Sequence, residues 1–245
     1  MYEIKYKPEF FEILNELSII NEKIMIESKD DKTIVFRKKE DGSIEYNLKV
    51  SKDYFDTGEY DKYAFYRYSD FYKFFKCLTV PKIYRDNNVI VMTDDQTKIE
   101  YILNDPNTLS TSGVGRDFSK FPSHDIELPI SMKDLETISK MATSFSAKKI
   151  RIYGNEHELY LKVIVGTNGQ YSNSFERKFE FTNVSNFEGE FDFMILADIF
   201  SKMLSKKKNY ILHIIRKGFI KIQTVTNNDI ELNLYTTKVL NKKGE

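Results

Sequence analysis

A block of lysines is the feature of this sequence most able to do chemistry. Lys206, Lys207 and Lys208 follow a stretch in which apolar residues recur at helical spacing, and two β-branched runs come after them. Lysines favour a helix C-terminus, where the backbone carries partial negative charge, and charge runs commonly solvate a surface. Lysines can also attract the phosphates of a nucleic acid without reading its bases. Both interpretations fit the block on its own.

Other segments with helical periodicity are charged as well. The segments with a net positive charge are residues 67–82, 131–149 and 195–208. Residues 8–20 are the exception, because they carry Glu9, Glu12 and Glu16 and no lysine or arginine. Three cations stand at the ends of this acidic segment: Lys5, Lys7 and Lys23.

No set of residues predicts catalysis. His124, His157 and His213 are scattered through a connector, a turn and a strand, so no metal-ligand spacing appears. Cys77 lies on the apolar side of a short helical stretch, where packing is expected rather than reactivity. The stretch GVGRD lacks the flanking strand and helix of a dinucleotide loop, and no P-loop is present. We therefore expect no enzyme activity, no cofactor and no metal.

The composition is that of a neutral globular protein. The chain has 245 residues, 41% of them hydrophobic, which is enough for two domains of ordinary size. Lys+Arg 37 balances Asp+Glu 37, so any attraction to phosphate must come from how the charges are distributed. A single cysteine, no signal-peptide pattern and no long apolar run predict a cytoplasmic protein with no membrane association.

The first half of the chain predicts short elements in a defined order. Proline at the first turn and an apolar stripe predict a helix over residues 8–20, and a second helix is predicted over residues 69–78. Ser69 or Asp70 is expected to cap this second helix, with Phe71, Phe74 and Phe75 on its buried face. The expected strands are residues 2–6, 23–28, 32–39, 43–50, 62–68, 82–86, 88–93 and 97–103.

The same order begins again after a connector rich in Ser, Thr, Gly and Pro. Phe11 of the first helix falls on Leu135 of a helix over residues 131–145, which opens with a capping-box-like Ser131 and Asp134. Strands are expected over residues 125–130, 149–154, 157–165, 174–182, 190–196, 210–215, 219–225 and 230–237, with a short helix over residues 195–208. An internal repeat of this length indicates two similar domains, 1–104 and 125–245, joined by the connector 105–124.

This duplicated pattern resembles the DNA sliding clamps, and most closely those of T4-like phages and of the proliferating-cell-nuclear-antigen type. Residues 131–163 resemble the second-domain helix and following strands of such a clamp, and residues 187–214 resemble its second helix with the preceding acidic turn. The resemblance implies an α+β fold with two DNA-clamp domains. Their antiparallel sheets would lie outside and two short helices per domain inside a homotrimeric ring.

Such a ring would surround double-stranded DNA without reading its sequence. Twelve helices about 10 Å apart would leave an opening of about 28 Å. Lysines on its wall would attract phosphates through water. The candidate DNA-facing residues are Lys73, Lys76, Lys82, Lys133, Lys140, Lys148, Lys149, Lys202, Lys206, Lys207 and Lys208.

The resemblance also implies partners that dock at the connector, including a DNA polymerase, while a separate clamp loader ATPase opens the ring. The candidate docking residues are Leu109, Val114, Phe118 and Phe121 in the loop, and Tyr235, Val239 and Leu240 in the tail. These apolar residues could equally fold back on their own domain. Residues 174–182 and either 82–86 or 88–93 are candidate edge strands for subunit contacts.

The expected function is that of a non-enzymatic polymerase processivity factor. The alternative is a β-rich viral structural or assembly protein whose duplicated domains form a ring without DNA. A clamp requires positive potential on its inward helices, whereas a shell protein does not.

Overall fold

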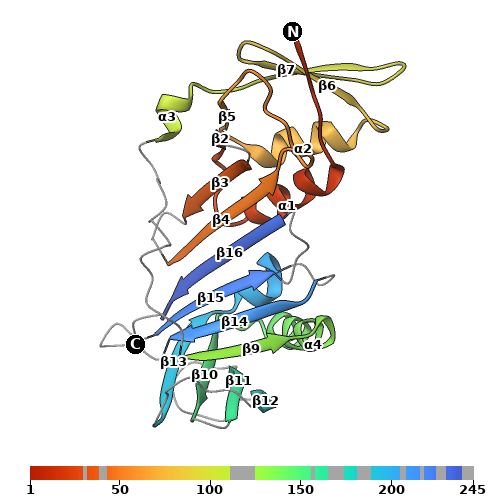
Figure 1. Cartoon of the computed structure of the whole chain (residues 1–245). Coiled ribbons are helices and arrows are strands. Elements are labelled where there is room, and N and C mark those ends of the chain that lie inside the picture. The colour runs from red at the N-terminus through yellow and green to blue at the C-terminus, as the bar shows by residue number, and fades with distance from the viewer. Residues whose placement is uncertain are drawn as a thin grey trace. The chain divides into compact units, whose positions relative to one another are not determined.

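The computed structural model describes residues 1–29, 32–38, 43–110, 125–155, 158–164, 174–180, 189–204, 208–215, 218–224 and 230–238 (Figure 1). The chain divides into two compact units. Unit 1 comprises Met1–Arg116 and Thr226–Leu232, and unit 2 comprises Asp117–Val225 and Asn233–Glu245. The domain boundaries taken from the sequence stay a prediction. That prediction did not place residues Thr226–Leu232 in unit 1.

Unit 1 follows the order strand, helix, four strands, helix, three strands. Its elements are β1 (Tyr2–Ile4), α1 (Pro8–Ser18), β2 (Ile24–Lys29), β3 (Lys32–Lys38), β4 (Ile44–Ser51), β5 (Lys62–Phe65), α2 (Tyr68–Lys76), β6 (Lys82–Asp86), β7 (Val89–Thr93) and β8 (Lys98–Ile102). One antiparallel sheet has the order β1-β6-β7-β8, and another has the order β5-β2-β3-β4. A further short helix, α3 (Pro106–Ser110), lies in the predicted connector.

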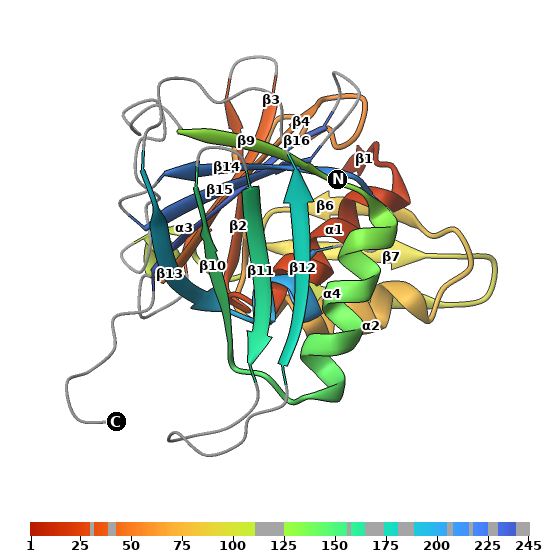
Figure 2. The same cartoon turned by 90° about the horizontal axis from the view of Figure 1, so that it is seen from below.

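Unit 2 repeats this order. Its elements are β9 (Ile126–Ile130), α4 (Met132–Ser144), β10 (Lys149–Gly154), β11 (Glu158–Ile164), β12 (Ser174–Glu180), β13 (Phe191–Leu196), η2 (Ile199–Met203), β14 (Tyr210–Ile215), β15 (Phe219–Thr224) and β16 (Ile230–Thr237), of which the residues up to Leu232 are grouped with unit 1. The strand orders are β9-β14-β15-β16 and β13-β10-β11-β12, the latter seen side by side in Figure 2. The predicted α+β fold with two similar domains of antiparallel strands is therefore confirmed.

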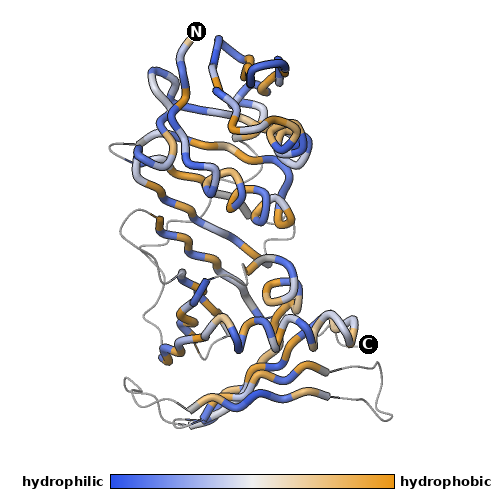
Figure 3. The backbone as a smooth tube through the Cα atoms, turned by 90° about the vertical axis from the view of Figure 1, so that its right-hand side faces the viewer, coloured by the Kyte–Doolittle hydropathy of each residue, from blue (hydrophilic) through white to orange (hydrophobic). Residues whose placement is uncertain are grey.

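Aromatic side chains fill the core of unit 1. Proline begins α1, and Phe10, Phe11 and Leu14 on one stripe of this helix are fully buried. α1 lies against α2, where the Phe11 ring is 4.9 Å from Phe75 and 5.4 Å from Phe71, measured between centroids. Hydrophobic and hydrophilic residues alternate along many strands in Figure 3, as expected where one face of a sheet is buried.

The predicted cap of α4 is confirmed. The Asp134 backbone N–H donates to Ser131 Oγ at 3.2 Å, and the Ser131 hydroxyl donates to the Asp134 carboxylate at 2.6 Å. The buried stripe of α4 is aliphatic, with Leu135, Ile138 and Ala142 facing η2 and β11. Each unit thus places two helical segments against each other.

The predicted capping of α2 is wrong. Arg67 occupies the N-cap position without a side-chain hydrogen bond, and the Ser69 backbone N–H donates to Glu22 Oε2 at 3.0 Å. The carboxylate of Glu22, from another part of the chain, thus accepts a hydrogen bond from a backbone N–H group in the first turn of α2. From the sequence, a side chain of Ser69 or Asp70 was expected to cap this helix.

The helix predicted over residues 195–208 is shorter and of a different kind. β13 runs to Leu196, and the helical segment covers Ile199–Met203 only. The Leu204 N–H donates to the Ile199 carbonyl at 3.1 Å, five residues earlier, which is the π-helical bond. Leu204 itself has an extended backbone, so the helix ends there.

One predicted edge strand is an edge and the others are not. β12 is the outer strand of its sheet among the described residues, as predicted. β6 and β7 lie inside theirs, and its outer strands among the described residues are β1 and β8. The alternation of polar and apolar residues shows that a strand has one buried face, but it does not distinguish an edge strand from a central one.

Candidate nucleic-acid interface

The two candidate lysines of α2 point away from the core. Lys73 and Lys76 are exposed, on the side opposite the buried Phe71 and Phe75. Lys73 Nζ lies 3.0 Å from Asp70 Oδ1, one helical turn earlier. Lys82 is exposed as well but begins β6, so it lies beyond the helix.

The lysines of α4 have a similar arrangement. Lys133 and Lys140 are exposed, and Lys140 Nζ lies 2.9 Å from Glu136 Oε1. Lys148 is exposed after the helix ends, and Lys149 is half-buried at the start of β10.

The lysines around η2 are only partly described. Lys202 is exposed, with Nζ 3.0 Å from Asp198 Oδ1. Lys208 is half-buried before β14. Lys206 and Lys207 lie outside the described residues, so their orientation stays a prediction.

The ion pairs of Lys73, Lys140 and Lys202 are weak enough for these lysines to bind another anion. Exposed pairs three or four residues apart on a helix stabilise it by only about 0.3–0.5 kcal/mol, so a phosphate can compete for the lysine. Five candidates make no ion pair with any residue of the described ranges: Lys76, Lys82, Lys133, Lys148 and Lys149.

The outward face of α1 is acidic, as the sequence predicts. Glu9 and Glu12 are exposed and Glu16 is half-buried. Burial, together with the charges of Glu12 and Glu16, raises the pKa of Tyr72 on the neighbouring helix. At the two ends of α1, Lys7 Nζ lies 4.0 Å from the centroid of the Tyr54 ring and Lys23 Nζ lies 5.2 Å from that of Tyr66.

The described docking candidates are buried rather than exposed. Leu109 is 2% exposed in α3, which contacts β2 and β5 of its own unit. Tyr235 is 8% exposed and lies within β16, not in a tail beyond it. These two residues therefore fold back on the protein, and their part in partner binding stays a prediction. Val114, Phe118, Phe121, Val239 and Leu240 lie outside the described residues.

Sequence reasoning missed an apolar surface beside the edge of β8. Phe74, which was expected in the core, is 42% exposed, and its ring centroid lies 6.4 Å from that of Tyr101 on β8. Ile102 at the end of the strand is 69% exposed. Phe74 follows the buried Phe71 by three positions, so whether it is buried depends on how wide the buried stripe of α2 is. The sequence alone does not give that width.

No metal centre or membrane-spanning helix accompanies these surfaces. Among the residues that the structure describes, no group of three or more histidine, cysteine, aspartate or glutamate side chains could hold a metal ion. Within the same ranges, no helix is long and apolar enough to cross a bilayer.

Comparison with known proteins identifies the fold. No protein-family model and no curated protein matches the sequence. Among solved structures, one of A. fulgidus PCNA with the C-terminal region of FEN-1 covers 99% of this chain and 100% of that chain, at 10% identity and a TM-score of 0.71.

Two further clamps agree with this result. PCNA from Thermococcus kodakaraensis covers 98% of this chain and 100% of its own, at 13% identity and a TM-score of 0.72. Proliferating Cellular Nuclear Antigen from Entamoeba histolytica covers 94% of this chain and 95% of its own, at 12% identity and a TM-score of 0.68. Across nearly its whole length, the chain has the fold of the proliferating cell nuclear antigens.

Proposed function

We propose that this protein is a DNA sliding clamp. Its copies close into a homotrimeric ring around duplex DNA and tether a polymerase and other replication proteins there. The observation that carries the proposal is the match of both units, over 98% of this chain and 100% of a solved PCNA chain, at a TM-score of 0.72. The exposed lysines on α2, α4 and η2 support it, because a clamp needs mobile attraction to phosphate rather than base readout.

The edges of the sheets support closure of the ring. β8 in unit 1 and β12 in unit 2 are both edge strands among the described residues. A head-to-tail contact in which β8 of one copy pairs with β12 of the next would leave neither edge open.

The exposed apolar residues beside β8 fit this contact. Phe74 and Ile102 would be covered when a second copy adds its strand to the edge. Three copies would supply six units, the number expected for a ring wide enough for duplex DNA. The proposal includes a cytoplasmic location, a phage or other viral source, and no catalytic activity of its own, so ring opening belongs to a separate loader ATPase.

The decisive experiment compares closed and linear DNA. The protein is loaded onto nicked circular duplex with a loader ATPase, and retention is followed by gel filtration before and after the circle is linearised. A sliding clamp stays on the circle and is lost from the linear ends. Retention that does not depend on topology would contradict the proposal and favour the structural protein that the sequence leaves as the alternative.

Native mass spectrometry tests the ring contact. The Ile102→Asp variant places a charge at the β8 edge and is expected to shift trimers toward monomers. The matched control is Val80→Asp, which changes a residue that is 84% exposed but lies outside β8. Equal dissociation by both variants, or none by Ile102→Asp in a protein that forms trimers, would exclude β8 from the contact.

A further inference from the structure

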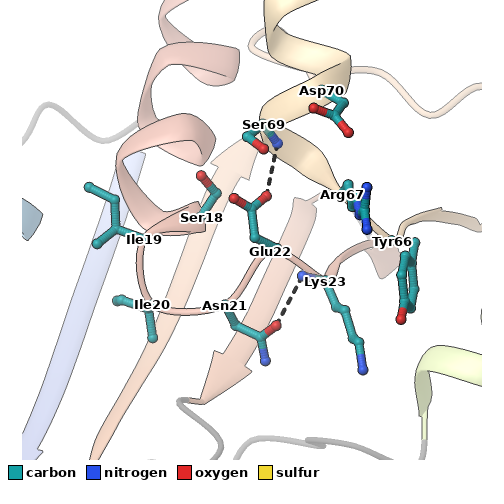
Figure 4. A pocket seen from close by; sticks show the side chains of 10 residues that line it. All are labelled: Ser18, Ile19, Ile20, Asn21, Glu22, Lys23, Tyr66, Arg67, Ser69 and Asp70. Atoms are coloured by element: carbon teal, nitrogen blue, oxygen red, sulfur yellow. Dashed lines mark hydrogen bonds between the residues drawn. The ribbon is translucent and has the colours of Figure 1, made fainter.

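A pocket of about 870 Å³ lies in unit 1 between the end of α1 and the start of α2 (Figure 4). Ligand pockets in proteins span about 300–1,000 Å³, so this one has room for a small molecule or a single residue of a polymer. It is lined by Ser18, Ile19, Ile20, Asn21, Glu22, Lys23, Tyr66, Arg67, Ser69 and Asp70. None of these residues was among the DNA-facing candidates.

An exposed aromatic ring and two cations lie together on one side of the pocket in Figure 4. Tyr66 is 48% exposed, whereas Phe65 directly before it and Tyr68 two residues after it are fully buried. Lys23 Nζ is 5.2 Å from the Tyr66 ring centroid. The exposed side chain of Arg67 makes no hydrogen bond or ion pair with any residue in the described part of the chain.

The carboxylates of the pocket are already engaged. Glu22 accepts the Ser69 backbone N–H at 3.0 Å, and Asp70 pairs with Lys73 at 3.0 Å. Neither carboxylate pairs with Arg67 in the described part of the chain. The groups of the pocket that can recognise a ligand are an aromatic face, a planar cation, a lysine and the hydroxyl of Ser69.

An aromatic platform beside cations is the chemistry that binds single-stranded nucleic acids, because bases stack on the ring while the cations hold the phosphates. In a duplex the bases are stacked inside the helix and cannot reach such a ring. We propose that this pocket binds one nucleotide of single-stranded DNA, with its base stacked on Tyr66 and its phosphate held by Arg67 and Lys23.

This inference goes beyond the clamp function and does not require a ring. It assigns the pocket to a strand that is unpaired, as at a primer end or a displaced flap. Failure of one proposal is therefore distinguishable from failure of the other: binding of linear oligonucleotides tests the pocket, whereas retention on circular duplex tests encirclement.

The test uses the full chain and a fluorescein-labelled oligo(dT), followed by fluorescence anisotropy. Tyr66→Ala is expected to weaken binding at least about fivefold, since stacking on one aromatic ring contributes that much per base. Tyr66→Phe should retain the affinity because the ring remains. Arg67→Gln should weaken binding and reduce the slope of log affinity against log salt by about 0.7, the value for one phosphate contact on a single strand.

Tyr54→Ala is the matched control. It removes another tyrosine with a lysine over its face, Lys7 at 4.0 Å, outside the pocket. Affinity within twofold of the wild type supports the assignment to Tyr66. A loss equal to that of Tyr66→Ala would overturn it, and so would absence of oligo(dT) binding by the wild type.

Two further measurements identify the ligand and its position. An oligonucleotide carrying 5-iodouracil should cross-link to Tyr66, as mapped by mass spectrometry, and a cross-link confined to other residues would overturn the proposal. Duplex of the same length should compete poorly, because its bases are stacked inside the helix. If the duplex competes as well as the single strand, the pocket does not bind an exposed base and the proposal fails.

Discussion

The two units share a strand order but differ in the chemistry of their cores. In unit 1, the Phe11 ring contacts five other aromatic rings at centroid distances of 4.9–5.8 Å. In unit 2, the equivalent residue is Leu135, fully buried on a helix with an aliphatic stripe. The same fold is therefore specified by which positions are buried, and different side chains can fill them.

The outward faces of the first helices differ as well. α1 presents Glu9 and Glu12, whereas α4 presents Lys133 and Lys140. Since the strand order is unaffected, these charges are free to serve function. The difference indicates that unit 2 and α2 would supply most of the attraction to phosphate, and α1 little or none.

The largest expected effect compares the two cores. Phe11→Ala should lower the free energy of unfolding by about 3–5 kcal/mol, and Leu135→Ala by about 2–5 kcal/mol, with the aromatic deletion the costlier because it leaves the larger cavity. Urea denaturation of both variants measures the two losses. Met132→Ala, at a position 45% exposed on α4, is the control and should change stability by no more than about 0.5 kcal/mol. A greater loss for Leu135→Ala would contradict this account of the cores.

A second comparison concerns one buried polar side chain in each unit. Arg85 lies between the rings of Tyr60 and Tyr63, 4.1 Å from each, and donates to the Lys62 carbonyl at 2.6 Å and the Asn87 carbonyl at 2.8 Å. In unit 2, His213 on β14 is also buried, and its Nε2 lies 3.1 Å from Gln223 Oε1.

Replacing the arginine should cost more than replacing the histidine. Arg85→Met leaves two carbonyls without a charged donor and should destabilise by about 2–3 kcal/mol, whereas His213→Gln should cost about 0.5–1.5 kcal/mol. Arg85→Lys should recover only part of the loss, because an ammonium cannot reproduce the planar fork. Thermal unfolding of the three variants decides this, and full recovery by lysine would show that charge alone matters.

The acidic and basic helices should differ in their effect on DNA binding. Lys133→Ala should reduce the salt slope of duplex binding by about 0.9, the value for one phosphate contact on B-DNA. Glu12→Ala on α1 should leave the slope unchanged or strengthen binding, since it removes a negative charge. Binding titrations over a range of salt concentrations measure both. A weaker complex with Glu12→Ala would show that α1 takes part in contacts that the charges do not explain.

The smallest expected effect lies on the β13-β10-β11-β12 sheet of unit 2. Arg151 donates to Asp192 at 2.8 and 2.5 Å, and this hydrogen-bonded pair lowers the pKa of Asp192 from its usual 3.8. Because the folded-state pKa is the lower one, the stabilisation is present above the unfolded value and is lost as the pH falls through the folded value.

The exposure of this pair limits its contribution to about 0.2–1 kcal/mol. Asp192→Asn should therefore be less stable than the wild type by that amount at pH 7, and the gap should close as the pH drops below about 3.8. Urea denaturation at pH 7 and below about pH 3.8 measures this difference in stability, with Glu190→Gln, at an exposed position, as the control. A gap that persists in acid would mean that Asp192 acts through something other than its charge.

Local periodicity predicted most of the fold. The order of elements in both units, the cap at Ser131 and the buried stripe containing Phe11 follow from spacings of two, three and four residues, which the chain states directly. The exposed acids of α1 were likewise visible in the sequence.

Features that depend on distant residues could not be read this way. The cap of α2 comes from Glu22, far along the chain from Ser69, and the exposure of Phe74 depends on what lies beside α2. The π-helical bond of Leu204 arises where a strand turns directly into a short helix. The pocket at Tyr66 was missed because a single tyrosine and a single arginine form no pattern until the fold brings Lys23 beside them.

The place of Glu231 in unit 1 has a consequence for folding. Its Oε2 lies 3.7 Å from Lys49 Nζ, although nearly all of unit 2 stands between the two residues in the sequence. A contact between residues this far apart closes a long loop, and the entropy of that loop must be lost before the contact stabilises the fold. Unit 1 would therefore complete its structure slowly, after the contacts among its first residues have formed.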